Sequence, residues 1–173
     1  MSRFGDDFEA ALVASGPHPA IRSDNQIFSP FIGSWDLKVA WFGEHGRQVR
    51  QEVGEWHFAW VLEGRAIQDV WIVPPRPLRS GAADLYEYGT SLRFFDPEVD
   101  AWRSTWIGPM HGMVWTFTAR RVGDRVVLET TAGCEPRMKW SFGDIASHSF
   151  NWRNEVWENG GWRLQQSFQC QRR

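Results

Sequence analysis

The stretch from Gly54 to Pro74 constrains the fold more than any other, because it has the pattern of one long β-hairpin. Residues 55–61 and 66–73 are rich in Trp, Val, Ile and Phe, which favour strands. Glu63-Gly64 lies between them, and glycine can take the positive φ that a tight turn needs. A two-residue loop and a four-residue loop both predict the same pairing of residues. That pairing is Val61 with Ala66, Trp60 with Ile67, Phe58 with Asp69 and Trp56 with Trp71.

Side chains alternate along a strand, so this hairpin has two different faces. One face is aromatic and contains a single acid, whereas the other mixes small, aliphatic and polar residues. A wall of indole and phenyl rings around one carboxyl group is typical of a ligand pocket. Apart from the acid, it is equally typical of an ordinary aromatic core. The aromatic face carries Trp56, Phe58, Trp60, Ile67, Asp69 and Trp71.

The remaining sequence repeats this pattern of short apolar runs separated by turn residues. Consecutive antiparallel strands with an apolar inner face usually close on themselves, because closure removes exposed edges. We therefore predict an all-β fold, an up-and-down antiparallel β-barrel of about ten strands. A two-sheet sandwich is the main alternative. The expected strands are 31–42, 47–53, 55–61, 66–73, 88–95, 101–107, 113–121, 125–131, 138–142, 149–158 and 162–171, with a loop over 74–87.

The N-terminal part has a different character from the strands. Residues 4–14 favour a short helix with acids in its first turn, and Gly16-Pro17 would end it. Residues 17–30 are irregular, and they either cross and close one end of the barrel or form a frayed tail. We assign residues 1–30 to a helix and closing segment and residues 31–173 to a barrel domain.

The composition argues against several classes of partner. A chain of 173 residues suits a single core, and its net charge of −2 gives no basic surface for nucleic acid or an anionic membrane. No segment resembles a signal peptide or a membrane-spanning helix, so we expect a cytoplasmic protein. Two cysteines, Cys134 and Cys170, cannot form a disulfide framework and are expected to be free thiols.

A short motif opens the first expected strand, and it resembles one found in the lipocalin and calycin barrels. The motif is Gly33-Ser34-Trp35, and the chain ends in Arg172 and Arg173. Lipocalins carry Gly-x-Trp on the first strand, near a barrel end that an N-terminal segment closes. A basic residue near their C-terminus packs over the Trp. The resemblance covers roughly residues 28–173 and implies that Arg172 or Arg173 packs over Trp35.

Three further stretches look like an uncharacterised bacterial lipocalin-like domain family that is distantly similar to nitrobindins. These are GRAIQDVW, YGTSLRFFDP with a following Trp, and W-x-x-E-x-W-E-N-G-G-W. The family brings no reaction with it. Nitrobindins bind haem through one His near the C-terminal strands, and His148 is the only candidate here. The Gly-rich loop of nitrobindins is missing, so we expect no haem and no other cofactor.

Asp69 is the candidate that packing alone explains least well. A buried carboxylate needs a cationic or N–H partner. Arg93 or Arg103 on the neighbouring hairpin is a possible cation, although both alternate with apolar residues and are expected to point outward. Asp69 is therefore either a functional acid in a cleft or a structural bond between strands.

Two histidines are further catalytic candidates, although the catalytic residues remain unknown. His57 and Glu55 lie two apart on one strand and have acid–base potential, but they face solvent if the Trp face is inside. His111 lies in the GPMHG loop, which would be at a barrel mouth. The five histidines show no metal-ligand spacing, and the sequence lacks phosphate-loop and nucleophile-elbow motifs, so we expect no metal.

The chain holds twelve Trp against two Tyr, so any cavity would be walled by indoles. We predict binding of a small apolar or aromatic molecule in a Trp-lined barrel cavity. The alternative is a cofactor-independent enzyme of the isomerase, lyase or cyclase type that uses an acid in that cavity. A third possibility is a filled barrel that self-associates, for example as a homodimer. The expected ligand-binding residues are Trp41, Trp56, Phe58, Trp60, Asp69, Trp71, Arg93, Trp106 and Trp115.

Overall fold

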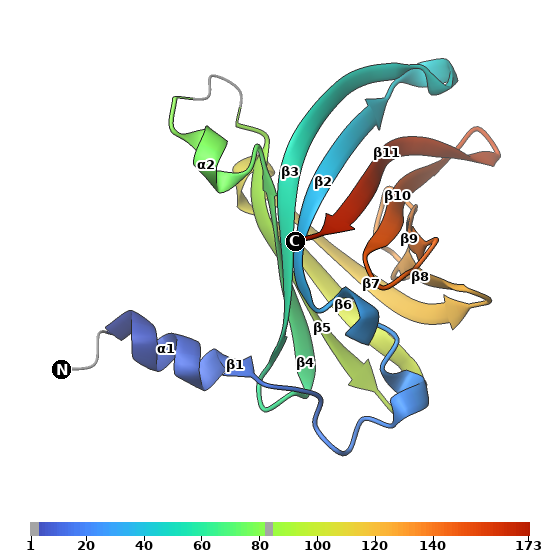
Figure 1. Cartoon of the computed structure of the whole chain (residues 1–173). Helices are drawn as coiled ribbons and strands as arrows, with labels where there is room; N and C mark the ends of the chain where they lie inside the picture. Colours follow the sequence, from blue (N-terminus) through green and yellow to red (C-terminus); the bar gives the residue numbers. More distant parts are fainter. Residues whose placement is uncertain (1–3, 82–84) are drawn as a thin grey trace.

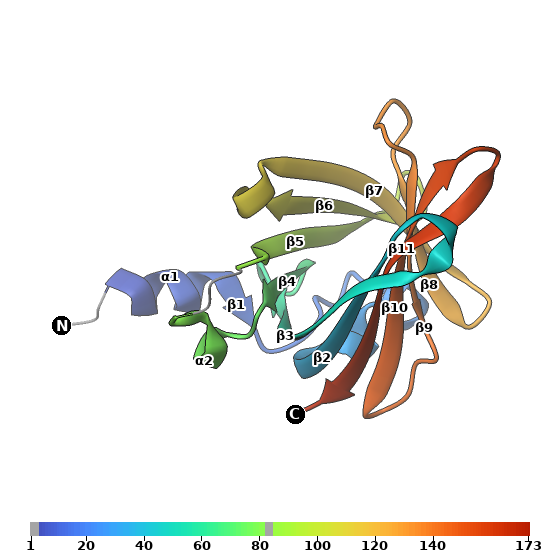
Figure 2. The same ribbon diagram turned by 90° about the horizontal axis from the view of Figure 1, so that it is seen from above.

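The chain forms a closed antiparallel barrel. A computed structural model describes residues 4–81 and 85–173. Ten strands, β2 to β11, form the ring, and the two-residue strand β1 (Val13–Ala14) pairs with β3 beside it. Seen from above, β5 to β7 lie on one side of the ring, and β2, β10 and β11 lie on the other (Figure 2). The predicted all-β barrel is therefore confirmed, rather than the two-sheet sandwich.

The central hairpin has the predicted register. Strands β3 (Gln48–Val61) and β4 (Ala66–Val73) pair Trp56 with Trp71 and Phe58 with Asp69. The turn uses the four-residue alternative, residues 62–65, with positive φ at Leu62, Glu63 and Gly64. One expectation was wrong: the two strands predicted over 47–53 and 55–61 are a single long strand.

The other strands follow one another around the barrel, each paired with its neighbour in sequence. The ring closes where β11 pairs with β2, from Gln166 opposite Trp41 to Arg172 opposite Trp35. The strands are β2 (Gly33–Phe42), β5 (Glu87–Asp96), β6 (Ala101–Gly108), β7 (Met113–Val122), β8 (Arg125–Thr130), β9 (Met138–Gly143), β10 (Ser149–Glu158) and β11 (Gly161–Arg172).

The helices are short and lie outside the ring. Helix α1 (Phe4–Leu12) stands away from the barrel (Figure 1). The segment predicted as a loop over 74–87 contains a one-turn helix, α2 (Arg76–Arg79). None of the described helices has the length and apolarity needed to cross a membrane. The remaining turns are the 3₁₀ helices η1 (Ser23–Asn25), η2 (Ser29–Phe31), η3 (Glu44–Gly46) and η4 (Pro109–His111).

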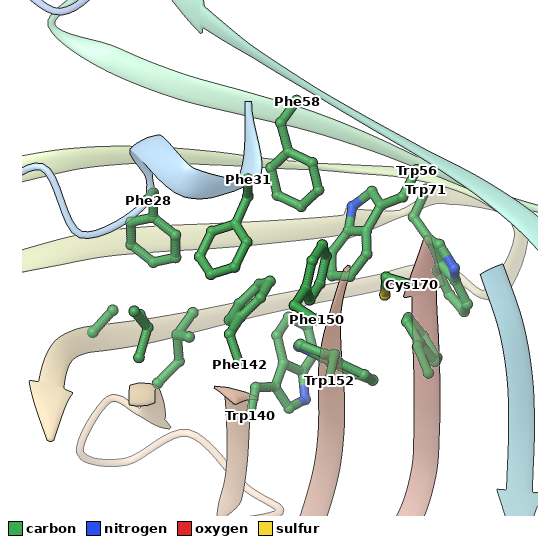
Figure 3. Packing of buried hydrophobic residues seen from close by; sticks show 14 of the residues in the cluster. Phe28, Phe31, Trp56, Phe58, Trp71, Trp140, Phe142, Phe150, Trp152 and Cys170 are labelled. Atoms are coloured by element: carbon green, nitrogen blue, oxygen red, sulfur yellow. The ribbon is translucent and has the colours of Figure 1, made fainter. Parts of the chain in front are cut away.

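Residues 17–30 close one end of the barrel, as the first of the two alternatives predicted. Phe28 and Phe31 are fully buried and meet the barrel ring Phe142 at centroid distances of 5.9 and 4.4 Å (Figure 3). Two buried indoles hold the same segment, since Trp35 Nε1 donates to the Phe31 carbonyl and Trp102 Nε1 donates to the Asn25 carbonyl, both at 2.7 Å. This half of the barrel is consequently filled with side chains.

Arg172 packs over Trp35, as the lipocalin resemblance implied. Its guanidinium carbon lies 4.1 Å from the indole centroid, and its N–H groups donate to the carbonyls of Pro30 and Ile32. Gly33 of the motif has φ +122°, and a Cβ there would lie 2.6 Å from Arg172 Nη1. The positive φ favours glycine at this position. The barrel is compatible with a lipocalin or calycin-like fold.

Candidate functional site

The other half of the barrel contains a cavity of about 610 Å³. Residues of the β2–β3, β6–β7 and β8–β9 loops lie among its lining at the end opposite the closing segment. Aromatic rings from strands all around the ring form its walls. These are Trp41, Trp56, Trp71, Tyr86, Trp106, Trp115, Trp140, Trp152 and Phe168.

Five of the predicted ligand-binding residues line this cavity. They are Trp41, Trp56, Trp71, Trp106 and Trp115. Two later indoles of the lining, Trp140 and Trp152, were not predicted, although the same alternation along β9 and β10 turns both of them inward. The three-dimensional neighbours of the central hairpin were not visible from local patterns.

Two other predicted aromatic residues lie in the filled half instead. Phe58 contacts the ring of Phe31 at a centroid distance of 6.0 Å, and Trp60 contacts Trp102 at 6.3 Å. Both point inward as predicted, but they pack beneath the cavity and are not part of its lining.

Asp69 and Arg93 form a buried ion pair in the filled half. Their side chains are 0% and 1% exposed, and the Arg93 guanidinium lies 5.1 Å from the ring centroid of Phe28 and 5.8 Å from that of Phe58. Neither residue lines the cavity. The contact matches the predicted structural bond between strands, and these observations give Asp69 no contact with the cavity space.

The expected outward orientation of Arg93 was wrong. Strand β5 turns polar or small residues inward and apolar residues outward, so that Leu92 and Phe94 are exposed while Arg93 is buried. The buried carboxylate of Asp69 across the sheet explains this, because an unpaired buried charge is costly. Arg103 does point outward and pairs with Asp96 on the surface.

Two acids line the cavity, Glu44 and the buried Glu87, and neither was predicted from the sequence. The Glu87 side chain is 3% exposed, and its Oε1 accepts the backbone N–H of Tyr88 at 3.0 Å. His111 Nε2 lies 3.9 Å from its Oε2, and the His111 ring lies 4.9 Å from that of Tyr86. His111 therefore lies at the mouth, as predicted. Glu87 was not predicted because it was assigned to the loop over 74–87, whereas β5 begins at this residue.

Several polar groups lie around the upper cavity wall. Gln166 Nε2 donates to Tyr86 Oη at 3.2 Å, and Asn154 Nδ2 donates to Gln166 Oε1 at 3.4 Å. The buried Asn154 Oδ1 has no hydrogen-bond partner within the described part of the chain. The indole N–H groups of five lining residues also lack a hydrogen-bond partner within the described part of the chain, although a buried Trp N–H usually has one. These are Trp41, Trp56, Trp71, Trp140 and Trp152.

Glu55 and His57 belong to a separate cluster on the outer face of β3. Glu55 is 1% exposed and lies 2.7 Å from Arg76 Nε, 3.1 Å from Arg173 Nη2 and 3.0 Å from His57 Nε2, while His57 Nδ1 lies 2.9 Å from Ser34 Oγ. Burial alone would raise the pKa of Glu55, but hydrogen bonds from Arg76 and His57 lower it to about 2. The cluster fastens α2 and Arg173 to the barrel wall and has no access to the cavity.

The remaining candidates lie far from the cavity. His148 is exposed in the β9–β10 loop at the closed end. In residues 4–81 and 85–173, no group of three or more His, Cys, Asp or Glu side chains gathers as a metal site. No protein-family model and no curated protein sequence matches this chain.

Proposed function

We propose that this protein binds one small, largely apolar or aromatic molecule in the indole-lined cavity. The observation that carries the proposal is a space of about 610 Å³ at one end of a closed barrel, walled by aromatic rings with a few polar groups among them. Pockets for small molecules have this size, apolar lining and small set of orienting polar groups.

The contrast between the two halves of the barrel supports the same conclusion. The closed half is packed by Phe28, Phe31 and their ring neighbours, so this sequence can fill a barrel interior when filling is favoured. In the open half, Ser91 occupies an inward position on β5 where a larger side chain would reduce the space. The cavity is thus built into the sequence rather than being a sign of loose packing.

Titration with a neutral aromatic alcohol, 2-(1-naphthyl)ethanol, tests this proposal by isothermal calorimetry. We expect saturable binding with one site per chain. Ser91→Leu places bulk in the cavity and should abolish binding, whereas Thr105→Leu adds bulk on the outer face of β6 and should not. Native mass spectrometry should show a small molecule retained by freshly purified protein, or the naphthyl alcohol bound to the chain after it is added. Equal binding by both variants would show that the alcohol binds elsewhere.

We further propose that Asp69 stabilises the filled half of the barrel through its ion pair with Arg93 and does not touch the ligand. Asp69→Asn removes one partner of a buried pair, so the free energy of unfolding should fall by about 3–5 kcal/mol. The affinity for the naphthyl alcohol, measured on the folded fraction, should stay unchanged. A clear loss of affinity in folded Asp69→Asn protein would instead place Asp69 in contact with the ligand.

A second candidate function is proton transfer within the same cavity, favoured by the approach of His111 to Glu87. An acid and a base beside an apolar cavity can move a proton on a bound carbon acid without a cofactor. The test uses the molecule retained in native mass spectrometry, incubated with protein in deuterated water. Deuterium at carbon that disappears in Glu87→Gln would establish an enzyme, and no exchange would leave a binding protein.

A further inference from the structure

Glu87 is a buried carboxylate without a strong cationic partner. Among the described residues, the only basic group within 4 Å of its oxygens is His111 Nε2, at 3.9 Å, which exceeds hydrogen-bond distance. Arg79 approaches the backbone but donates to the carbonyls of Val73 and Glu87, not to the carboxylate. Burying a charge without a partner is costly, so this oxygen pair favours a cation in the cavity.

The other charges on the cavity lining do not supply that cation. Among the described lining residues, Arg163 is the single Arg or Lys, and its guanidinium pairs with Glu158. Glu44 at the rim adds a second carboxylate. The lining therefore has an excess of negative charge, carried by Glu87 and Glu44.

Three rings of the same cavity lining suit a cation as well as an apolar group. Trp71 lies 5.8 Å from Trp106 and 5.9 Å from Tyr86, measured between ring centroids. Aromatic faces attract ammonium and guanidinium groups by their quadrupole. The protein already shows this at the same wall, where the guanidinium of Arg50 lies 5.0 Å from the Trp41 ring and 5.3 Å from the Tyr86 ring.

The backbone also makes room for the carboxylate. A Cβ on Gly108 would lie 2.7 Å from Glu87 Oε2 and 3.0 Å from Trp106 Nε1. Glycine at this position thus keeps the acid and the indole side by side at the cavity wall. A side chain there would push the carboxylate out of place.

We propose that the cavity takes an organic cation, an arylalkyl or alkyl amine whose ammonium group pairs with Glu87 while its apolar part lies against the indoles. This inference rests on the proposed function, since it names the chemical class of the ligand for the same cavity. The ammonium group would donate to the carboxylate and meet the faces of Trp71, Trp106 and Tyr86. Neutral and anionic analogues of the same shape lack that pairing.

Three matched probes test the inference by calorimetry at pH 7: 2-(1-naphthyl)ethylamine, 2-(1-naphthyl)ethanol and 3-(1-naphthyl)propanoic acid. The amine should bind about tenfold or more tightly than the alcohol, and the acid should bind most weakly. Glu87→Gln should remove the preference for the amine, so that the amine and the alcohol bind with similar affinity. Glu44→Gln, the matched rim control, should keep most of the preference, and near-ultraviolet circular dichroism should show that both variants keep the native packing.

The outcomes separate the inference from the function on which it rests. Equal affinity for amine and alcohol in the unaltered protein, or an amine preference that survives in Glu87→Gln, would overturn the inference while the binding function stands. Binding of none of the three probes would overturn both. A retained preference in Gly108→Ala would show that the carboxylate need not sit beside Trp106, and it would also contradict the proposed geometry.

Discussion

At the scale of single residues, the position of each carboxylate decides its role. Asp69, Glu87 and Glu55 are all buried, but they lie in the filled half, on the cavity wall and on the outer face of the barrel. Asp69 has a full ion-pair partner, and Glu55 has two guanidinium groups. Among the described residues, the one basic group near Glu87 is His111, whose Nε2 lies 3.9 Å away. The acid with the weakest protein partner is therefore the one best placed to meet a ligand.

Glu55 should make stability depend on pH in a defined window. Its pKa is lowered to about 2 from an ordinary value of 4.5, so its stabilisation is complete above pH 4.5 and is lost as pH falls towards 2. In urea unfolding at a series of pH values, this group should contribute on the order of 3 kcal/mol, because each tenfold shift in proton affinity is worth about 1.4 kcal/mol.

The variant Glu55→Gln isolates this contribution. It should be less stable than the unaltered protein at pH 6, and the difference should shrink as the pH approaches 2. Glu129→Gln is the matched control, because Glu129 forms an exposed pair with Arg137 at 3.6 Å and should contribute less than about 1 kcal/mol. A constant difference between Glu55→Gln and the unaltered protein across this range would contradict the assignment.

At the scale of elements, hairpins were predictable and faces were less so. The register of β3 with β4 followed from alternation and one glycine turn. Strand β5 was different. The alternation of side chains along β5 was clear, but neither face was marked as the buried one by its composition. Only the ion pair with Asp69 on β4 determines that Arg93 points inward. The position of Glu87 depended on the same tertiary choice.

The turn at Gly64 links the central hairpin to the N-terminal segment, and a pair of alanine substitutions tests this. Gly64 and Gly160 have φ of +77° and +79°, so either change to Ala should cost about 1–2 kcal/mol of backbone strain. A Cβ on Gly64 would also overlap the backbone of Gly16 and His18, whereas nothing lies near one on Gly160.

The two variants should therefore differ in their free energies of unfolding. Gly64→Ala should lose about 1–3 kcal/mol more than Gly160→Ala in urea denaturation. It should also open residues 12–20 to limited proteolysis, because His18 N–H donates to the Gly64 carbonyl at 2.9 Å. Equal stability and equal protection in the two variants would show that this contact contributes nothing.

At the scale of the whole molecule, one guanidinium group joins the closing segment to β2 and β11, the first and last strands of the ring in sequence. Arg172 on β11 covers Trp35 on β2 and binds the carbonyls of Pro30 and Ile32. Arg172→Ala should lower the free energy of unfolding by about 2–3 kcal/mol through lost cation–π and charged hydrogen bonds. Arg153→Ala, an exposed change on β10, should stay within about 0.5 kcal/mol in the same denaturation experiment. A loss no larger than that of the Arg153 control would show that Arg172 does not clamp the closed end.

The closing seam has a consequence for how the chain acquires this structure in time. Every other pair in the ring joins neighbours in sequence, whereas β2 must wait for β11. During translation, the growing sheet keeps two free edges and leaves its indole-rich face wet until the last strand of the ring docks. The risk of aggregation is highest in that interval. We therefore expect aggregation to depend on translation rate and chaperone contact more than on the stability of the finished barrel.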